Sequence, residues 1–296
     1  MHKVTIIGAG VVGTALGYLL KINGYKIVGI ASRTLQSAQK AKKFIGEGAA
    51  STDIASIAGK ADIVFITTSD SAIEKVCNKI ASEKGFKKGA SVFHTCGALS
   101  SNVLRAARNN RAHVASFHPL QSLAGVKEAV KRLPGSYFCI EGDKPALADA
   151  KSIIAVLKGK EINLQVNKKP LYHAGACAAS NFLVATVGFG LELFEAAGIN
   201  RKDSLRSLMP LIKGTVKNIE QLGIPSALTG PVARGDADII HGHLRAIPKE
   251  RRDMVRLYSE LGRYTVKVAL EKGTLKEKTA DKIISLFNKY QKGTNI

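Results

Sequence analysis

The chain has 296 residues, 45% of them hydrophobic and 23% charged, and a formal net charge of +21. This balance is typical of a globular protein long enough for two domains, and it excludes a largely disordered chain. The lysines and arginines are dispersed along the whole length, and there is no tryptophan. A basic patch with aromatic residues that stack on nucleic-acid bases is therefore not expected, and we interpret the charge as a solvated surface that attracts anionic small molecules.

The N-terminal segment MHKVTIIGAGVVG has no small-residue cleavage site, and glycines interrupt its apolar run. Neither a signal peptide nor a membrane span is expected there. The four cysteines, Cys77, Cys96, Cys139 and Cys177, are far apart and form no CxxC pair. This spacing argues against a disulfide framework or a zinc ribbon. We therefore expect a cytoplasmic protein with reduced thiols, no bound metal and no membrane association.

Short β-branched runs alternate with amphipathic helical patterns up to about residue 166, which predicts a mostly parallel, doubly wound sheet with crossover helices. The predicted strands are residues 4–8, 26–31, 62–68, 90–95, 113–118 and 136–142. Beyond residue 166 the strand patterns end and long helical patterns follow, at residues 171–198, 201–223, 249–272 and 274–291. We therefore place an α/β domain at residues 1–166 and an all-helical domain at residues 167–296.

A GxGxxG motif follows the first predicted strand and opens the first predicted helix. Gly8 permits the tight turn, Gly10 lets the backbone approach a pyrophosphate, and Gly13 allows the helix to pack on the strand. The backbone N–H groups at the helix start, those of Val11 and Val12 included, are free to bind phosphate oxygens. The motif in this position predicts a Rossmann domain that binds a dinucleotide.

The second predicted strand ends at Ser32 and Arg33, where a site that prefers NAD usually has a carboxylate against the ribose hydroxyls. A serine hydroxyl and an arginine guanidinium suit a 2′-phosphate instead, because arginine donates two parallel charge-assisted hydrogen bonds. Alternatively, Ser32 caps the next helix and Arg33 is only solvated. The missing carboxylate favours NADP as the cofactor in either case.

Ligands of open α/β sheets bind beyond the carboxyl ends of the strands. Polar side chains follow three predicted strands there: Thr68 and Ser69, then His94, then His118. We expect the first three to contact the cofactor, although Ser69 could equally cap the next helix. Two histidines at neighbouring strand ends suggest a shared cleft, and imidazole titrates near neutral pH, so His118 is a candidate for proton transfer.

The segment HAGACAASN, residues 173–181, is read as a helix whose alanines leave room beside a polar stripe. His173, Cys177, Ser180 and Asn181 share that stripe because residues three, four, seven and eight apart lie on one helix face. Further on, Thr229, Gly230 and Arg234 lie in ALTGPVARGD, which resembles a loop leading into a helix N-terminus. Such a loop could hold the anionic end of a substrate, or it could be a capped helix entry with Arg234 in water.

The segments GAGVVG, HTCGALSS, FHPLQS, YHAGACAASN and LTGPVARGD together resemble an uncharacterised family of Rossmann-like oxidoreductases with a helical C-terminal domain of unknown function. The resemblance covers nearly the whole chain. That family is similar to pyrroline-5-carboxylate reductase, ketopantoate reductase, deazaflavin-dependent NADP reductase and the 6-phosphogluconate dehydrogenase superfamily. The resemblance implies a helical domain whose first long helix walls the nicotinamide site and which builds a homodimer.

In the hydroxyacid dehydrogenases of this group, that helix carries a lysine four residues before an asparagine. Here Asn181 matches the asparagine, which orients the substrate, but Cys177 stands at the lysine position. A thiol is a poor acid for an alkoxide, so the hydroxyacid reaction is not carried over. His173 or His118 could transfer the proton instead, and an imine that is already protonated would need no strong acid.

We therefore expect an NADP-dependent oxidoreductase that transfers a hydride between the nicotinamide and a small anionic imine, keto acid or hydroxy acid, in a cleft between the two domains. His118, His173 and Asn181 are its expected catalytic residues. Cys177, Ser180, Thr229, Gly230 and Arg234 are its expected substrate-binding residues. The alternative is a non-catalytic NADP-binding protein that senses redox state or serves a partner.

Overall fold

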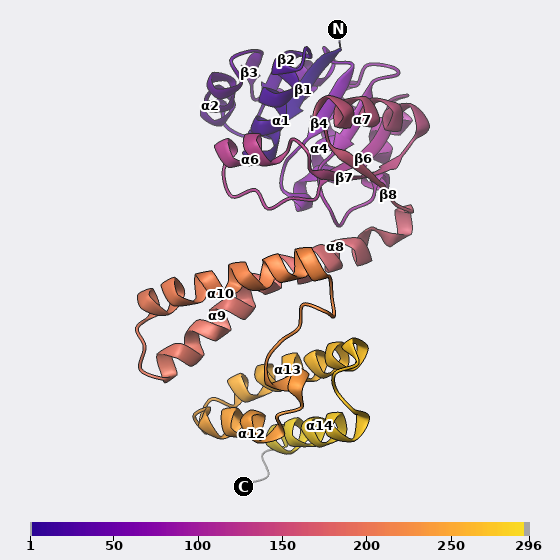
Figure 1. Cartoon of the computed structure of the whole chain (residues 1–296). Coiled ribbons are helices and arrows are strands. Elements are labelled where there is room, and N and C mark those ends of the chain that lie inside the picture. The colour runs from indigo at the N-terminus through magenta and orange to yellow at the C-terminus, as the bar shows by residue number, and fades with distance from the viewer. Residues whose placement is uncertain (1, 293–296) are drawn as a thin grey trace. The chain divides into compact units, whose positions relative to one another are not determined.

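The computed structural model describes residues 2–292 and divides the chain into two compact units, residues 1–181 and 182–296 (Figure 1). The strands lie in the first unit, and four of the six helices numbered α9 to α14 supply the main core of the second. The division comes later in the chain than residue 166, so helix α8 (Lys169–Ala179) belongs to the unit that contains the sheet.

The first unit is built on one eight-stranded sheet with the order β3-β2-β1-β4-β5-β6-β7-β8. All neighbouring strands pair in parallel except β6 and β7, which are antiparallel. The carboxyl ends of β1, β4, β5 and β6 therefore lie at one edge. The strands are β1 (Lys3–Ile7), β2 (Lys26–Ala31), β3 (Ala49–Ser51), β4 (Ile63–Ile66), β5 (Ser91–His94), β6 (His113–Pro119), β7 (Tyr137–Gly142) and β8 (Lys160–Asn163).

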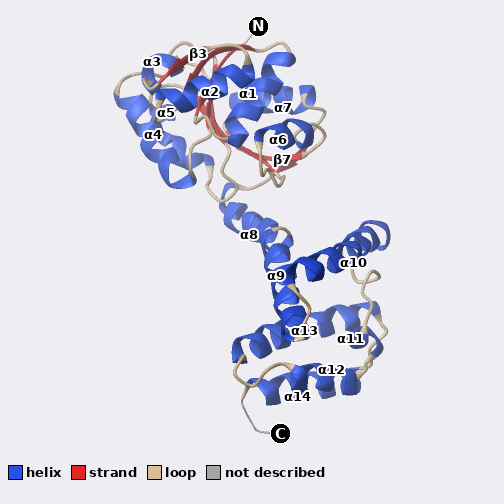
Figure 2. Ribbon diagram, turned by 90° about the vertical axis from the view of Figure 1, so that its left-hand side faces the viewer, coloured by secondary structure: helices blue, strands red, loops and turns tan. Residues whose placement is uncertain are grey.

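Helices cover both faces of this sheet (Figure 2). Apolar residues of α1, α2, α6 and α7 form the core on one face, and those of α3, α4 and α5 form the core on the other. The helices are α1 (Val11–Ile22), α2 (Leu35–Ile45), α3 (Ile54–Ala58), α4 (Asp70–Ser82), α5 (Arg105–Asn109), α6 (Val126–Arg132) and α7 (Lys144–Val156), with short 3₁₀ turns η1 (Ser101–Leu104) and η2 (Val166–Lys168).

The second unit has a core formed by apolar residues of α11 to α14, and a smaller cluster joins α9 to α13 through Phe189 and Met254. Gly262 of α13 lies so close to the ring of Phe287 of α14 that any larger residue would displace it. The helices are α9 (Asn181–Ala196), α10 (Arg201–Leu222), α11 (Pro231–Arg234), α12 (Ala237–Ala246), α13 (Arg252–Lys272) and α14 (Glu277–Gln291).

The expected fold class, a Rossmann-type domain with a mostly parallel sheet followed by a helical region, is confirmed. The predicted strands did not include β3, whose three residues are too short to show a period, or β8, whose four residues include one apolar side chain. They also gave no direction for β7, because alternation identifies a strand but not its orientation. The antiparallel β7 is the feature that brings the start of this strand, rather than its end, beside the carboxyl end of β6.

Four phenylalanine rings at the centre of the sheet supply a test of this packing. The fully buried ring of Phe117 lies 5.0–5.9 Å, between centroids, from the rings of Phe65, Phe93 and Phe138. We expect Phe117→Ala to lower the free energy of unfolding by about 3–5 kcal/mol, because the residual cavity adds to the lost burial. Urea denaturation would measure it, with the exposed Ile22→Ala as control; equal losses in both variants would contradict this packing.

Candidate functional site

The glycine-rich turn after β1 is held by β4. Gly8 has a φ of +114°, and its carbonyl oxygen accepts a hydrogen bond of 2.7 Å from Thr67 Oγ1. A Cβ at Gly8 would lie 2.6 Å from the Thr67 carbonyl carbon, and one at Gly13 would lie 2.3 Å from the Gly8 oxygen. Both positions therefore require glycine for close backbone packing, as the sequence predicted.

Gly10 differs from its two neighbours in the motif. It is the residue before α1, it is exposed, and a Cβ placed on it would meet no atom within 4 Å. The N–H groups of the first helical residues, Val11 and Val12 among them, have no partner within the helix. Open space beside free N–H groups at the positive end of a helix fits a pyrophosphate.

The end of β2 leaves Ser32 and Arg33 available to a ligand. The helix that follows is capped by Thr34, whose side chain accepts a hydrogen bond from Ser37 N. Capping by Ser32, the alternative considered from the sequence, is therefore wrong. Arg33 is exposed, and among the described residues its guanidinium forms no ion pair.

Thr67, which the sequence analysis did not single out, fixes the glycine turn, whereas the expected Thr68 and Ser69 come next in the chain. Ser69 precedes α4 but its side chain makes no capping hydrogen bond. The Thr68 hydroxyl donates only a long hydrogen bond, 3.4 Å, to the Ser69 carbonyl oxygen. Both side chains are thus free to turn toward a ligand at the carboxyl edge.

His94, at the end of β5, is completely buried. Its Nδ1 accepts a hydrogen bond of 3.2 Å from Cys96 N, so the proton of the neutral ring is on Nε2. Burial, together with the nearby positive charge of Lys169, lowers the pKa of His94 to about 4. The ring is therefore neutral at pH 7, and it shapes the strand end as a buried residue.

A buried lysine joins α8 to the sheet. Lys169 begins α8 and has 0% of its surface exposed. Its Nζ donates hydrogen bonds of 2.7 Å to Ser116 Oγ and 3.3 Å to the Cys96 carbonyl oxygen, and it lies 5.8 Å from the centre of the Tyr172 ring. Burial lowers the pKa of Lys169. This residue was missed from the sequence, although it lies on the same helix stripe, four residues before His173.

The antiparallel pairing of β6 and β7 completes the polar cluster around Lys169. Ser116 lies opposite Glu141, and His118 opposite Cys139. Because opposite residues point to the same face of a sheet, all four side chains point to one side. Glu141 is buried and accepts hydrogen bonds from Ser101 N and Ser101 Oγ, at 2.7 and 2.8 Å.

His118 and His173, two of the expected catalytic residues, come together in this unit. Their ring centroids are 6.2 Å apart, and a Cβ on Gly97 would lie 2.8 Å from His118 Nε2 and 2.5 Å from His173 Cδ2. Both rings can therefore approach Gly97 closely only because it has no side chain. His118 Nδ1 is 2.9 Å from the Tyr172 hydroxyl, and Cys177 Sγ is 3.7 Å from His173 Nδ1.

His118 is half-buried, and burial, with the positive charge of Lys169 next in effect, lowers its pKa to about 3. An imidazole with this pKa is uncharged at pH 7. It can donate or accept a hydrogen bond, but it does not serve as an imidazolium acid at that pH. His118 can therefore take part at pH 7 as a hydrogen-bond donor or acceptor, but not as the acid that protonates the substrate.

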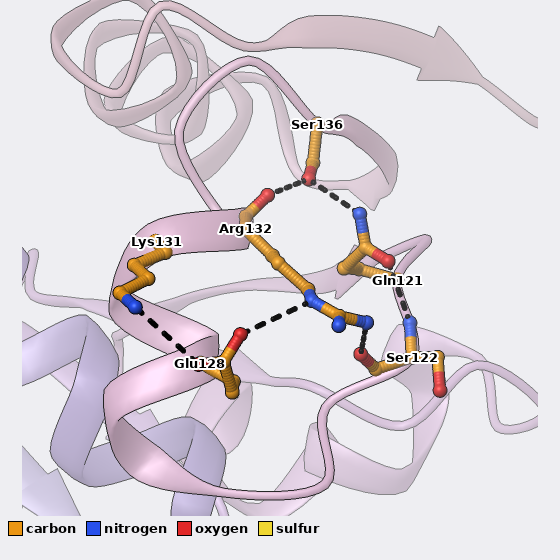
Figure 3. A network of polar contacts seen from close by, with 6 residues as sticks. All are labelled: Gln121, Ser122, Glu128, Lys131, Arg132 and Ser136. Carbon is orange, nitrogen blue, oxygen red and sulfur yellow. Dashed lines mark hydrogen bonds and ion pairs between the residues drawn. The ribbon is translucent and has the colours of Figure 1, made fainter.

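A hydrogen-bonded network fastens the loop that follows His118 (Figure 3). Gln121 bonds to Ser136 Oγ and accepts from Ser122 N, while Arg132 of α6 donates to the Ser122 carbonyl oxygen and pairs with Glu128. The loop from β6 to α6 is thereby attached to its own helix and to the start of β7. The end of β6 is held firmly as a result.

The remaining expected residues are not gathered in this cluster. Ser180 and Asn181 follow α8 and are exposed. Thr229, Gly230 and Arg234 belong to the second unit, where Arg234 Nε donates to Asp236 Oδ2 at 2.8 Å. Asp236 precedes α12, but its side chain makes no capping hydrogen bond. The Arg234 guanidinium is therefore partly engaged by a neighbouring carboxylate.

Comparisons with known proteins assign both parts of the chain. A model of a Rossmann-like domain matches residues 1–119, and a model described as a domain of unknown function, DUF2520, matches residues 136–265. The chain combines a Rossmann-like domain with a DUF2520 domain. This combination confirms the resemblance expected from the sequence motifs. No curated protein matches the chain.

Solved structures share the fold of nearly the whole chain. A candidate NADP oxidoreductase from Bacteroides fragilis is 26% identical with a TM-score of 0.73, over 90% of this chain and 98% of that one. A protein from Thermotoga maritima is 27% identical with a TM-score of 0.70, over 91% and 99% of the two chains. A reductive aminase from Aspergillus terreus, in complex with NADPH and ethyl levulinate, is 14% identical with a TM-score of 0.62, over 96% and 98%.

One helical stretch, residues 166–196, is long and apolar enough by length and composition to cross a membrane, with a mean hydropathy of 1.5. Only 11% of its most apolar window is buried. A helix that packs against other protein passes the same test, so length and composition alone do not identify a membrane anchor.

The two depressed histidine pKa values predict how stability changes with pH. Histidine in the unfolded chain has a pKa near 6.5, so below that pH the unfolded chain binds protons that folded His94 and His118 exclude. The free energy of unfolding is therefore not reduced by these two histidines above pH 6.5, and it falls as the pH drops below that value. Between pH 7.5 and 5 we expect each to lower the free energy of unfolding by about 2 kcal/mol.

Urea denaturation at the two pH values measures this loss. His118→Asn should reduce the decrease by about 2 kcal/mol, since asparagine does not titrate. The same decrease in both proteins would show that His118 titrates alike in the folded and unfolded chain.

Proposed function

We propose that this protein is an NADP-dependent oxidoreductase that transfers a hydride between the nicotinamide and a small anionic imine, keto acid or hydroxy acid. The observation that carries the proposal is the open space at Gly10, beside the free N–H groups at the start of α1. Gly8 and Gly13, on either side of it in the motif, have no such space because other backbone atoms pack against them. The 26% identical structure described as a candidate NADP oxidoreductase, which matches over most of both chains, supports the same class.

The cofactor preference rests on the end of β2. No carboxylate stands there to bind the ribose hydroxyls, and both Ser32 and Arg33 are free of helix capping. A guanidinium that is exposed and forms no ion pair can bind a 2′-phosphate with two parallel hydrogen bonds. This arrangement favours NADP over NAD.

Side chains at the carboxyl ends of β4, β5 and β6 are the ones that would contact the nicotinamide and the substrate. A reduced nicotinamide bound there would supply the hydride. Thr68, Ser69 and His94 border the edge that the cofactor would follow, and His118 with His173 presents ring nitrogens beside Gly97. We further propose that Asn181 orients the substrate. Separately, we propose that the Arg234 loop of the second unit binds an anionic group.

The homodimer that the sequence led us to expect has a candidate surface on the second unit. Leu205, Met209, Val216 and Ile219 form one stripe along α10, and each is 38–49% exposed. Exposed apolar residues of α9 add to it: Phe182, Leu183 and Val184. An uncovered apolar surface of this extent, on the order of several hundred Å², is comparable with one side of a standard interface. We propose that a second copy of the chain covers it.

Replacing Gly10 tests the pyrophosphate site. Gly10→Ala places a methyl group in the open space, so we expect NADPH to bind at least about tenfold more weakly while the unfolding free energy changes by less than about 1 kcal/mol. Gly125→Ala is the matched control, because Gly125 also precedes a helix, is extended and has no atom within 4 Å of a built Cβ. NADPH binding that survives in Gly10→Ala would place the cofactor elsewhere.

Replacing Arg33 tests the cofactor preference. We expect the unmodified protein to bind NADPH more tightly than NADH, as measured by nicotinamide fluorescence. Arg33→Ala should weaken NADPH binding by about 10–100-fold, because it removes charge-assisted hydrogen bonds, and leave NADH binding unchanged. Equal losses for both nucleotides would mean that Arg33 does not recognise the 2′-phosphate. Tight cofactor binding without turnover of ketones, imines or keto acids would favour the non-catalytic redox sensor.

Sedimentation velocity tests the dimer. We expect a particle of twice the 31.5 kDa chain mass, and Val216→Asp should convert it to a monomer because a carboxylate would be buried without a partner. Ile22→Asp, an exposed apolar residue on α1, is the control and should remain a dimer. A monomer that binds phospholipid vesicles through the same residues would instead make the surface a membrane contact.

A further inference from the structure

The Tyr172 hydroxyl has two possible hydrogen-bond partners, His118 and Cys139. The protonation states of these groups decide to which of them the phenol donates its hydrogen. It is 2.9 Å from His118 Nδ1, and the Cys139 side chain is its other polar neighbour. Burial raises the pKa values of both Tyr172 and Cys139, so the phenol and the thiol both keep their hydrogens at pH 7. Sulfur is a weak acceptor, so the phenol hydrogen of Tyr172 goes to the better acceptor, His118 Nδ1, rather than to Cys139 Sγ.

This accounting leaves the proton of His118 on Nε2. That nitrogen is on the side of the ring that faces Gly97, away from Tyr172. His118 is half-buried, whereas Lys169 and Ser116 behind it are wholly buried. His118, like Tyr172 and His173, keeps part of its surface exposed, so its Nε2–H is a donor that a small molecule can approach.

Lys169 acts on His118 from behind. Its Nζ uses two hydrogens for Ser116 Oγ and the Cys96 carbonyl oxygen, and it forms no ion pair within residues 2–292. The nearest carboxylate to consider, that of Glu141, is engaged by Ser101. A buried positive charge close to an imidazole opposes its protonation. Burial is the larger cause of the low pKa of His118, and the charge of Lys169, which also fastens α8 to the sheet, adds to it.

We propose that Lys169 and Tyr172 are positioning residues that hold His118 as a neutral imidazole with its proton on Nε2, and that this N–H binds the carbonyl oxygen of a keto acid. The proposal rests on the function proposed above and selects among its substrate classes. A neutral imidazole N–H polarises a carbonyl group, and the positive charge of Lys169 stabilises negative charge that develops on oxygen. The same charge disfavours a protonated imine.

The reaction that follows is balanced. A reduced nicotinamide bound here would supply the hydride that forms the new C–H bond at the carbonyl carbon, and would itself be oxidised. The electron pair of the C=O π bond moves to oxygen, where it is stabilised by the His118 Nε2–H. The oxygen then takes a proton from water, which reaches this half-buried ring. His118 ends in the state in which it began, so no imidazolium acid is required.

The groups that face His118 come from three elements. Helix α8 supplies Tyr172, His173 and Lys169, β7 supplies Cys139, and β5 supplies His94. None of these side chains is a carboxylate, and His94 is uncharged at pH 7. Glu141, two residues from Cys139 on the same sheet face, is the one carboxylate that this part of the described chain places near Lys169.

Nitrogen NMR of protein labelled with ¹⁵N-histidine tests the state of His118 without any turnover. The His118 signals are identified by their loss in His118→Asn. We expect a protonated Nε2 and an unprotonated Nδ1, unchanged from pH 8 to pH 5. A proton on Nδ1, or titration of this ring near pH 6.5, would overturn the proposal.

Two variants separate the parts of Lys169 and Tyr172. Tyr172→Phe removes the donor to Nδ1, so the ring should populate both tautomers, whereas Tyr137→Phe on the exposed start of β7 should change nothing. Lys169→Met should raise the pKa of His118, and Lys168→Met, an exposed neighbour, should not. If Lys169→Met does not fold, Tyr172→Phe still decides. A His118 tautomer unaffected by Tyr172→Phe would remove Tyr172 from this role.

Oxamate and pyrrolidinium, added to protein saturated with NADP⁺, test the substrate class. Oxamate mimics a keto acid, and pyrrolidinium mimics a protonated imine. We expect oxamate to shift the His118 Nε2 signal and pyrrolidinium to leave it unchanged. The reverse result, or no shift with either, would overturn the assignment of this N–H to a carbonyl. A protein that binds no NADP⁺ while keeping the Nε2–H tautomer would refute the proposed function and not the state of His118.

Discussion

One buried ammonium group organises the candidate site. Lys169 Nζ binds a backbone carbonyl that follows β5 and a hydroxyl on β6, and the helix that carries it also carries Tyr172 and His173. Burying a lysine is costly unless its hydrogens find acceptors. Since one acceptor is in β6 and the other directly follows β5, these hydrogen bonds fix the start of α8 against the sheet. The positions of Tyr172 and His173, which follow on the same helix, depend on this attachment.

The sequence was sufficient for most of the fold. Strand runs such as residues 62–68 and 113–118 are buried on both sides, so they read as apolar segments, and the glycine motif fixed where the first strand gives way to the first helix. The short strands β3 and β8 and the direction of β7 were not accessible. All three depend on which strand lies alongside, and that information is spread over the whole sheet rather than held in any segment.

The candidate site was predictable where one element supplies it and not where several do. His173 and Cys177 are four residues apart on one helix, and their pairing follows from helical geometry. The pairing of His118 with Tyr172, or of Lys169 with Ser116, joins residues more than fifty positions apart. Lys169 was also hidden by its type, because a lysine is ordinarily solvated and nothing in NKKP distinguishes the buried one from the exposed one beside it.

The two ends of the antiparallel strand β7 are under different constraints, one from the candidate site and one from backbone packing. Its early residue Cys139 lies opposite His118, at the edge where chemistry would occur, whereas its last residue Gly142 packs against the middle of β6 with no room for a side chain. In a parallel strand the ligand-facing end is also the end that leads into the next helix. Here the two are separated, so descendants of this chain could vary the early part of the strand and acquire new specificity while its late part keeps the fold.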